Sequence, residues 1–359
     1  MLVYFTVLTI VVLAAYLARK SESKIVSRLM LGIAFLSMVL VAGLRNQYVG
    51  TDSMAYIYFF NRTRTFIDAI ILGEDMQEHG FWILTWLVHY LSNQYMALFF
   101  VIALIVISCY QWAIVQYSEL IEISFFVFIT MGFYLFFFNG ARQGIACALY
   151  TLAIGQMLEK HFFKYTAIVL LAYFFHKTAI MMIPMYFFIN RPNTLKNNMF
   201  IMVIGCTAMM FIDRIVGFAT TIDARYSQYG TGGGGGGYYS FAFTFVLGVF
   251  FLIFRDSVRI GRYQYDRFLN MFLFGAMIGV VSILLRLDPS GLMRYGEYFN
   301  LTAIFIWPIV FKNLTGKLQR FIIGYSFVVF YLVMFFLTTE AFSNFIPYTF
   351  NPIVSDLFK

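Results

Sequence analysis

Arginines are the residues of this sequence whose positions most need a chemical explanation. Arg45 follows an apolar stretch long enough to cross a bilayer and opens a polar segment, 45–56, that also holds Asp52 and Tyr56. Only 12% of the 359 residues are charged. A charged side chain at membrane depth is costly and commonly marks a functional site. The alternative is a polar loop that lets the chain turn at the membrane surface.

Other arginines lie, like Arg45, at the ends of apolar segments or in the loops between them. A guanidinium binds phosphate oxygens through paired hydrogen bonds, so several arginines on one face would hold an anion such as a lipid phosphate or pyrophosphate. We therefore predict a pyrophosphate site formed by Arg142, Arg45, Arg294, Arg286 and Arg225, with Arg142 as its leading member. For each arginine, the alternative role is to reach toward lipid headgroups.

A proton acceptor is the second chemical element to look for. His176 titrates near neutral pH, follows two phenylalanines and lies between two short apolar segments, which makes it a candidate general base. A histidine bonded to the backbone at a helix end is the alternative. Asp52 and Glu297 are rival bases, and Asp52 could equally cap a helix that starts at Ser53.

Aromatic residues near these groups are candidates for sugar binding. Tyr56, Trp82 and Trp86 have rings that could stack on sugar faces. The alternative is an interfacial belt, where tyrosine and tryptophan are enriched in membrane proteins.

Several kinds of chemistry are absent from the sequence. The ATP-binding pattern G-x-x-x-x-G-K-[ST] does not occur, and the four histidines lack the spacing of a zinc site. Few carboxylates lie within the apolar segments, which weakens a proton-coupled transporter. We therefore predict no metal and no cofactor. The net charge of +8 does not indicate nucleic acid, because membrane proteins gather Lys and Arg in cytoplasmic loops.

The elements that must position these residues are membrane helices. Apolar residues make up 61% of the chain and form blocks that are longer than barrel strands and do not alternate. We predict an all-α, polytopic bundle. It has about twelve transmembrane helices, at 2–18, 29–44, 95–115, 123–138, 144–158, 165–175, 178–190, 199–217, 239–254, 268–285, 298–311 and 321–337.

Basic residues predict the orientation of this bundle. The loops on one side hold fifteen Lys and Arg and six Asp and Glu, whereas the other side holds ten and eleven. The first side is therefore predicted to be cytoplasmic, with both termini outside. The five arginines and His176 then fall on the outer side. The number of predicted helices changes by up to two if 81–90 crosses the membrane or if 165–190 does not form two spans.

The predicted organisation is a single transmembrane domain, 1–359. Residues 45–80 form an outer loop with interfacial helices, and 218–238 form an outer Gly-rich loop. The run Gly232–Gly237 lacks the following Lys-Ser/Thr of a phosphate cradle and is predicted to be a flexible tether.

A series of short motifs resembles the EpsG/Wzy-type polysaccharide polymerases of bacteria. The matching pieces follow the family's order: Arg45 with Gly50-Thr51-Asp52 and Tyr56, Glu78-His-Gly80-Phe81, Asn139-Gly140 with Arg142-Gln143-Gly144-Ile-Ala146, His176-Lys177-Thr178-Ala179 with Pro184, Arg294 with Tyr298-Phe299 before Pro308, and Pro347-Tyr348. His79 departs from the pattern, which often has proline there. The glycine run matches no family feature.

The resemblance implies a GT-C-like membrane glycosyltransferase in the bacterial inner membrane, acting on its outer face. Such an enzyme joins oligosaccharide repeat units of an O-antigen or capsule. Donor and acceptor are carried on undecaprenyl pyrophosphate in the membrane lipid, and a chain-length regulator protein is a further expected partner. A sugar hydroxyl of the acceptor attacks the anomeric carbon of the donor, and lipid pyrophosphate leaves.

Other classes of protein remain as alternatives. A flippase for lipid-linked oligosaccharides would show internal repeats and charges within its helices. An acyltransferase could use His176. An O-antigen ligase shares the chemistry of the polymerase but normally carries one large outer loop, whereas the longest polar stretch here is 45–80.

Overall fold

The computed structural model consists of helices in the parts of the chain that it describes, which are residues 1–76, 78–194, 196–200, 203, 238–284, 292–341 and 343–356. The chain divides into two compact units, called here unit 1 (1–183 and 316–359) and unit 2 (184–315). The predicted helix 199–217 and the predicted loop 218–238 lie almost entirely outside the described residues. Arg225, Arg286 and the glycine run lie outside them as well.

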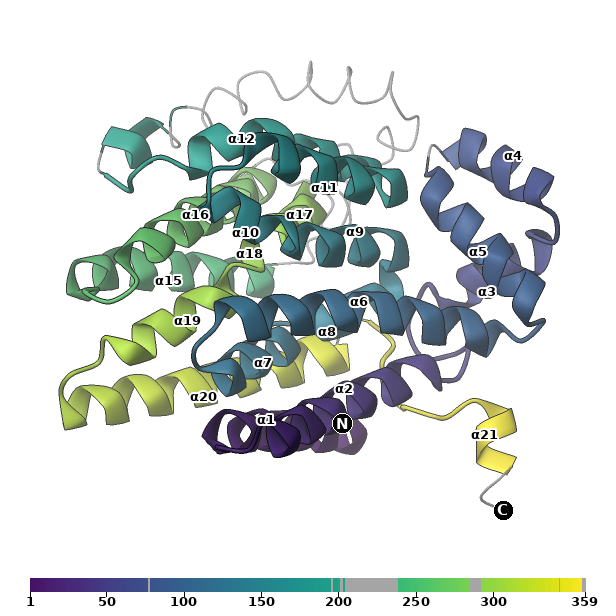
Figure 1. The fold of residues 1–359 in the computed structure, drawn as a ribbon, viewed down its shortest axis with the longest axis horizontal. Helices are drawn as coiled ribbons and strands as arrows, with labels where there is room; N and C mark the ends of the chain where they lie inside the picture. Colours follow the sequence, from purple (N-terminus) through teal and green to yellow (C-terminus); the bar gives the residue numbers. More distant parts are fainter. Residues whose placement is uncertain are drawn as a thin grey trace. The chain divides into compact units, whose positions relative to one another are not determined.

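Unit 1 contains most of the long helices (Figure 1). Its elements are α1 (Leu2–Lys20), α2 (Lys24–Gly43), α3 (Ser53–Arg62), α4 (Phe66–Met76), α5 (His79–Leu91), α6 (Tyr95–Tyr117), α7 (Ile121–Thr130), α8 (Phe133–Asn139), α9 (Ala141–Thr151), α10 (Ala153–Leu158), α11 (Phe162–Phe175), η1 (Lys177–Met181), α20 (Lys317–Ala341) and α21 (Pro352–Asp356). The helix α12 (Met182–Ile189) crosses the boundary to unit 2.

Among the described residues, five helices are long and apolar enough to span a membrane. They are Leu2–Lys20, Lys24–Gly43, Tyr95–Tyr117, Ile121–Asn139 and Lys317–Glu340. The chain is therefore an all-α integral membrane protein. The total of about twelve spans and the outward placement of the termini stay predictions.

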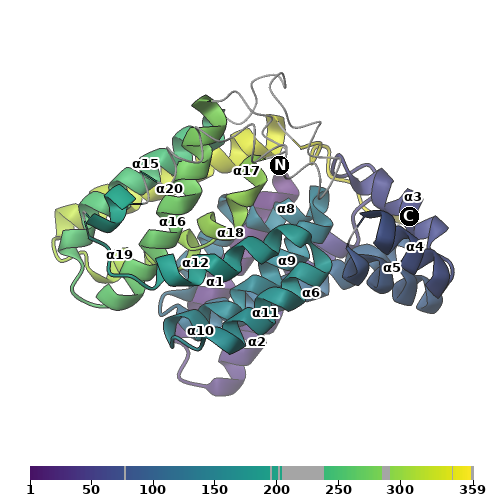
Figure 2. The same ribbon diagram turned by 90° about the horizontal axis from the view of Figure 1, so that it is seen from above.

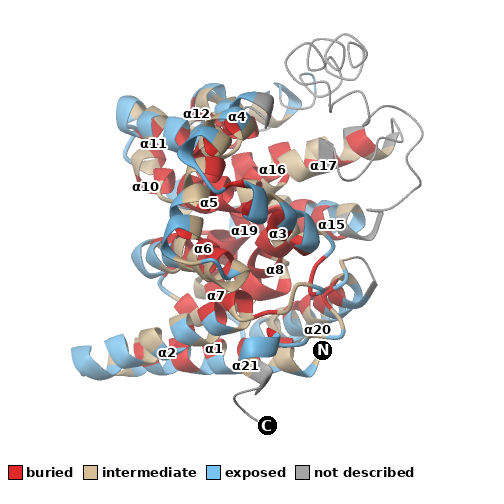
Figure 3. Cartoon of the chain, turned by 90° about the vertical axis from the view of Figure 1, so that its right-hand side faces the viewer, coloured by how far each residue is buried: buried red, intermediate tan, exposed pale blue. Residues whose placement is uncertain are grey.

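Apolar side chains on the long helices point outward as well as inward. In α20, Leu318, Phe321 and Tyr325 are each about two-thirds exposed or more, and α2 shows a similar pale-blue face in Figure 3. Large exposed apolar surfaces mark contact with other proteins or with membrane. On helices of spanning length, lipid is the natural contact.

Two helix boundaries differ from the sequence predictions in ways that matter for the site. The predicted helix 123–138 is broken into α7 and α8 at Gly132, whose φ of +92° is favourable for glycine. The predicted helix 144–158 begins earlier, at Ala141, so Arg142 lies in the first turn of α9 and not in the preceding corner.

Close helix contacts in unit 1 bring distant segments together. α1 packs against α2 and α7, α2 against α6, and α9 against both α6 and α11, as the view in Figure 2 also shows for α6, α9 and α11. At the cytoplasmic side predicted above, Arg19 joins α1 to α7 by donating to both carboxylate oxygens of Glu122, at 2.7 to 3.0 Å.

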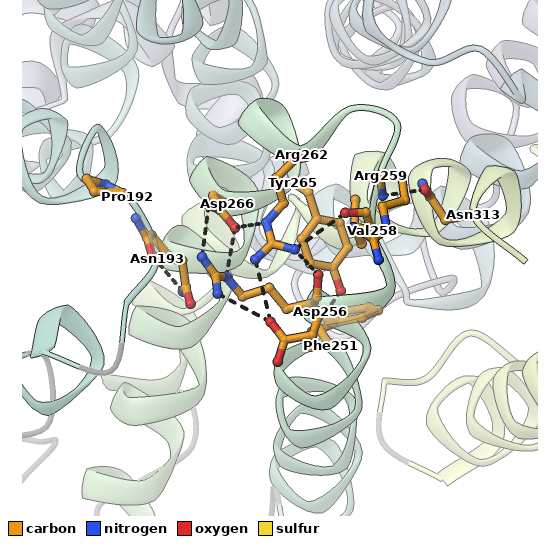
Figure 4. Close-up of polar contacts among 12 residues, drawn as sticks. Pro192, Asn193, Phe251, Asp256, Val258, Arg259, Arg262, Tyr265, Asp266 and Asn313 are labelled. Carbon is orange, nitrogen blue, oxygen red and sulfur yellow. Dashed lines mark hydrogen bonds and ion pairs between the residues drawn. The ribbon is translucent and has the colours of Figure 1, made fainter.

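Unit 2 contains α15 (Tyr238–Phe254), η3 (Arg255–Ser257), α16 (Arg262–Leu284), α17 (Leu292–Tyr295), α18 (Glu297–Asn300) and α19 (Ala303–Lys312). In the basic segment between α15 and the start of α16, arginines pair with nearby aspartates (Figure 4). The buried carboxylate of Asp266 accepts from Arg255 at 2.9 and 3.2 Å and pairs with Arg262 at 3.2 Å. The side chain of Asn313 bonds the backbone of Arg259 and Ile260. These contacts hold the turn between α15 and α16.

The first testable prediction concerns Gly43, at the point where α2 meets α6. A Cβ added at Gly43 would lie 2.8 Å from Cα of Phe100, so Gly43→Ala must separate the two helices. Such overpacking costs about 1–3 kcal/mol. We expect a lower Tm for the purified protein in detergent.

Gly32 in the same helix is the matched control. A Cβ there meets nothing within 4 Å, so Gly32→Ala should leave Tm unchanged or slightly raised. Equal Tm values for the two variants would contradict the packing of α2 on α6.

Candidate functional site

Glu78 is the centre of the candidate site in unit 1. Its side chain is fully buried at the start of α5. Arg142, in the first turn of α9, donates through Nη1 to one carboxylate oxygen of Glu78. His176, which follows α11, lies with Nδ1 against the other. Three segments far apart in the sequence therefore meet on one carboxylate.

The exposure of these three side chains differs. Glu78 is 0% exposed, whereas Arg142 is 24% and His176 is 18% exposed. A buried carboxylate without partners would be strongly unfavourable, and a positively charged guanidinium and an imidazole N–H offset that cost. The carboxylate is therefore enclosed, while the two groups that it binds keep surface through which they could touch a ligand.

Close backbone contacts bring the ends of these segments together. A Cβ at Gly80 would lie 2.6 and 2.8 Å from Cδ1 and the carbonyl oxygen of Phe174, so α5 can approach the end of α11 only with glycine there. This contact lies two residues from Glu78 and two from His176.

Tyr56 fixes the corner that carries Arg142. Its ring is buried, and its hydroxyl accepts from the N–H of Ala141 at 2.8 Å and donates to the carbonyl oxygen of Asn139 at 3.2 Å. The first turn of a helix leaves N–H groups without intrahelical partners, so the tyrosine satisfies one of them. Tyr56 thus has a structural contact in the site. Its predicted contact with sugar stays a prediction.

The segment after Arg45 packs against the same corner. Gly50 has a φ of +97°, and a Cβ there would lie 2.6 Å from Oδ1 of Asn139. Asp52 precedes α3 at the cap position without a capping hydrogen bond from its side chain, while its carbonyl oxygen accepts from Tyr56. Its predicted role as a base stays a prediction.

Arg45 is buried, and its contacts within the protein explain why an arginine follows the apolar helix α2. Its Nη1 donates to the carbonyl oxygen of Ala42 at 2.6 Å, at the negative end of α2. Its guanidinium carbon lies 3.8 and 4.3 Å from the ring centroids of Phe99 and Phe138. Burial lowers its pKa to about 10, so it stays charged at neutral pH.

The side chain of Arg45 has no exposed surface, so a pyrophosphate could reach it only if the covering residues moved. The C-terminal segment provides part of that cover. Asn46 N–H donates to Thr349, Asn351 N–H to Leu44, and Arg45 forms a β-bridge with Phe350. We assign Arg45 an architectural role, and its direct contact with a ligand stays a prediction.

The predicted sugar-binding tryptophans lie on α5, one and two turns after Glu78. Trp82 is 1% exposed and packs against Phe59 and Phe81, with its ring centroid 5.9 Å from the guanidinium carbon of Arg142. Trp86 is half-buried against Phe66 and Tyr90. Trp82 thus forms part of the wall beside Arg142.

The remaining described candidates lie in unit 2. Arg294 ends α17 and Glu297 begins α18. Burial raises the pKa of the Glu297 carboxyl to about 7, against a smaller opposing effect of Arg294. A carboxyl that titrates near neutrality is suited to proton transfer, so Glu297 remains a candidate base.

The sequence predicted no role for Glu78, which appeared only as the first residue of the motif Glu78–Phe81. One signal was available. Glu78 is one of seventeen acidic residues in the chain and directly precedes an apolar segment. Its two cationic partners are 64 and 98 residues away, a pairing that a single sequence does not show.

The second prediction tests the corner held by Tyr56. Tyr56→Phe removes the hydroxyl and leaves the N–H of Ala141 buried without this acceptor, which costs about 1–3 kcal/mol. We expect a lower Tm. Tyr58→Phe is the control, because Tyr58 is exposed in the same helix and its hydroxyl accepts from the exposed Arg62. An unchanged Tm in Tyr56→Phe would refute the structural role.

The third prediction concerns pH. Because the folded chain holds the proton of Glu297 with a pKa of about 7, against an ordinary 4.5, the free energy of unfolding falls as pH rises between these values. Glu297→Gln should raise Tm at pH 8 and have less effect at pH 5. Glu340→Gln, at an exposed position, is the control. A pH-independent effect would contradict the burial of this carboxyl.

Comparison with known proteins adds the family. The model of the EpsG family matches residues 28–350, a range that includes Glu78, Arg142 and His176. No curated protein and no solved structure matches the chain. Since the family model covers most of the sequence, the chain belongs to the EpsG family, which is associated with exopolysaccharide synthesis.

Proposed function

We propose that the chain is a membrane glycosyltransferase that polymerises undecaprenyl-pyrophosphate-linked oligosaccharide units on the outer face of the inner membrane. The single observation that carries the proposal is the meeting of Arg142 and His176 on the buried carboxylate of Glu78. A guanidinium suited to binding an anion and an imidazole suited to accepting a proton contact the same carboxylate, which supports the proposal. Family membership supplies the polysaccharide context.

The reaction requires a leaving group to be stabilised. As the bond between the anomeric carbon and the pyrophosphate oxygen breaks, negative charge builds on the pyrophosphate. Stabilising such developing charge is commonly the largest single contribution to catalysis. Arg142 has five N–H donors in a planar fork, a geometry that suits paired contacts with phosphate oxygens.

The reaction also requires a proton acceptor. The acceptor hydroxyl forms the new bond to the anomeric carbon and loses its proton as it does so. Nδ1 of His176 lies against Glu78. In the neutral imidazole, Nε2 then carries the lone pair that takes this proton. The proposed roles are pyrophosphate binding for Arg142 and general base for His176.

For unit 2, Arg294 is proposed to contact a phosphate and Glu297 to be a rival base. Trp86, which is half-buried, is proposed to border the sugars, whereas the buried Trp82 is proposed to support Arg142. Orientation toward the outer face rests on the distribution of basic residues in the loops.

The fourth prediction tests this function in cells that lack the native protein. Arg142→Ala and His176→Ala should each abolish the long glycan ladder on a gel while a single repeat unit remains, because polymerisation is lost and export is not. Arg64→Ala, at an exposed site in unit 1, should keep the full ladder. Immunoblots should show equal protein in the membrane.

The other patterns exclude the proposal in distinct ways. Loss of even the single repeat unit indicates a flippase. Long chains that are made but not attached to their surface anchor indicate a ligase. An unchanged ladder in both variants refutes the assigned site.

A further inference from the structure

The role of Glu78 goes beyond the residues that the proposed function uses. We propose that Glu78 is a positioning residue that holds the guanidinium of Arg142 and the imidazole of His176 in one fixed arrangement. The inference rests on the proposed function for its chemical purpose. Its physical content, the coupling of a guanidinium and an imidazole through one carboxylate, is testable without any substrate.

Each carboxylate oxygen of Glu78 contacts a different partner. Oε2 accepts from Arg142 and Oε1 faces Nδ1 of His176, so neither partner displaces the other. A carboxylate between two donors fixes both their separation and their orientation. Because Glu78 is fully buried, water does not compete for either bond.

The contact with Glu78 determines the tautomer of His176. An ionised carboxylate only accepts hydrogen bonds, so Nδ1 must carry a proton. This leaves Nε2 as the basic nitrogen of the neutral ring. When Nε2 takes a proton, the imidazolium lies beside a carboxylate that stabilises it. Glu78 thereby orients the base and supports the charge that the base acquires.

The contact with Glu78 also positions Arg142. An arginine near the membrane surface that only reached for lipid headgroups would need no buried partner. Here the guanidinium donates to a buried oxygen of Glu78, and α5 packs closely against the end of α11 at Gly80, two residues further on. Prior positioning of a charged donor lowers the entropy and reorganisation that binding an anion would otherwise cost.

The fifth prediction uses the small number of histidines as a probe. The chain has four, so selective ¹⁵N labelling of histidine in nanodiscs gives few signals, and His176→Asn assigns that of His176. In Glu78→Gln, His176 should titrate at lower pH than in the unchanged protein, and the preference for a proton on Nδ1 should weaken. The signal of His161, which is exposed, serves as the internal reference.

Two further variants make this measurement decisive. Glu74→Gln changes an exposed glutamate in α4 and should leave the His176 titration unchanged. Glu78→Asp keeps the charge on a shorter side chain, so His176 should titrate at a pH between those of the unchanged protein and Glu78→Gln. If the Gln variant folds poorly, Glu78→Asp replaces it in the comparison. If His176 titrates at the same pH in Glu78→Gln as in the unchanged protein, the coupling does not exist and the inference is overturned.

The purpose of the coupling is tested separately by glycan length in cells. Displacement of reacting groups by an ångström can cost about 100-fold in rate, so Glu78→Gln should remove the long ladder, and Glu78→Asp, whose carboxylate is one methylene shorter, should shorten it strongly. A full ladder in Glu78→Gln overturns the positioning role. If Arg142→Ala and His176→Ala also leave the ladder intact, the site assigned under the proposed function is refuted, and the titration still decides whether Glu78 couples the two side chains.

Discussion

A buried negative charge is the constraint on which much of unit 1 depends. The carboxylate of Glu78 is enclosed by protein, and a charge in such surroundings is tolerated only with partners that compensate it. Arg142 and His176 provide that compensation, so α5, α9 and the end of α11 cannot drift apart without exposing an unpaired carboxylate. The small residue at Gly80 permits the approach that these bonds require.

Arg45 presents the opposite case, a buried positive charge without a carboxylate partner among the described side-chain contacts. Two aromatic faces, the carbonyl oxygen of Ala42 and the negative end of α2 take the place of an anion. The C-terminal segment runs beside this arginine and bonds the backbone of residues 44–50 from more than 290 positions away. The arginine that first suggests a ligand site therefore organises the protein around that site.

The class of fold could be predicted from the sequence, because the fold class depends on composition and on the length of apolar segments, which are local properties. The helix in 95–117 and the short helices on either side of His176 follow from such patterns. The break at Gly132 and the early start of α9 were missed, because each depends on a contact or a backbone angle at one residue. Arg142 and His176 were chosen for their chemistry, and Glu78 was missed because its role exists only through partners brought together by packing.

The burial of Glu78 bears on what the site can do. A carboxylate open to solvent would compete with a pyrophosphate for Arg142 and would repel the anion as it approached. Enclosed and bound to two donors, its charge is largely balanced locally, so an approaching anion meets the exposed edges of a guanidinium and an imidazole instead. The same enclosure keeps Nδ1 of His176 committed to Glu78. In the proposed site, Glu78 thus holds the proposed anion-binding group and the proposed base side by side from a position that a ligand cannot reach.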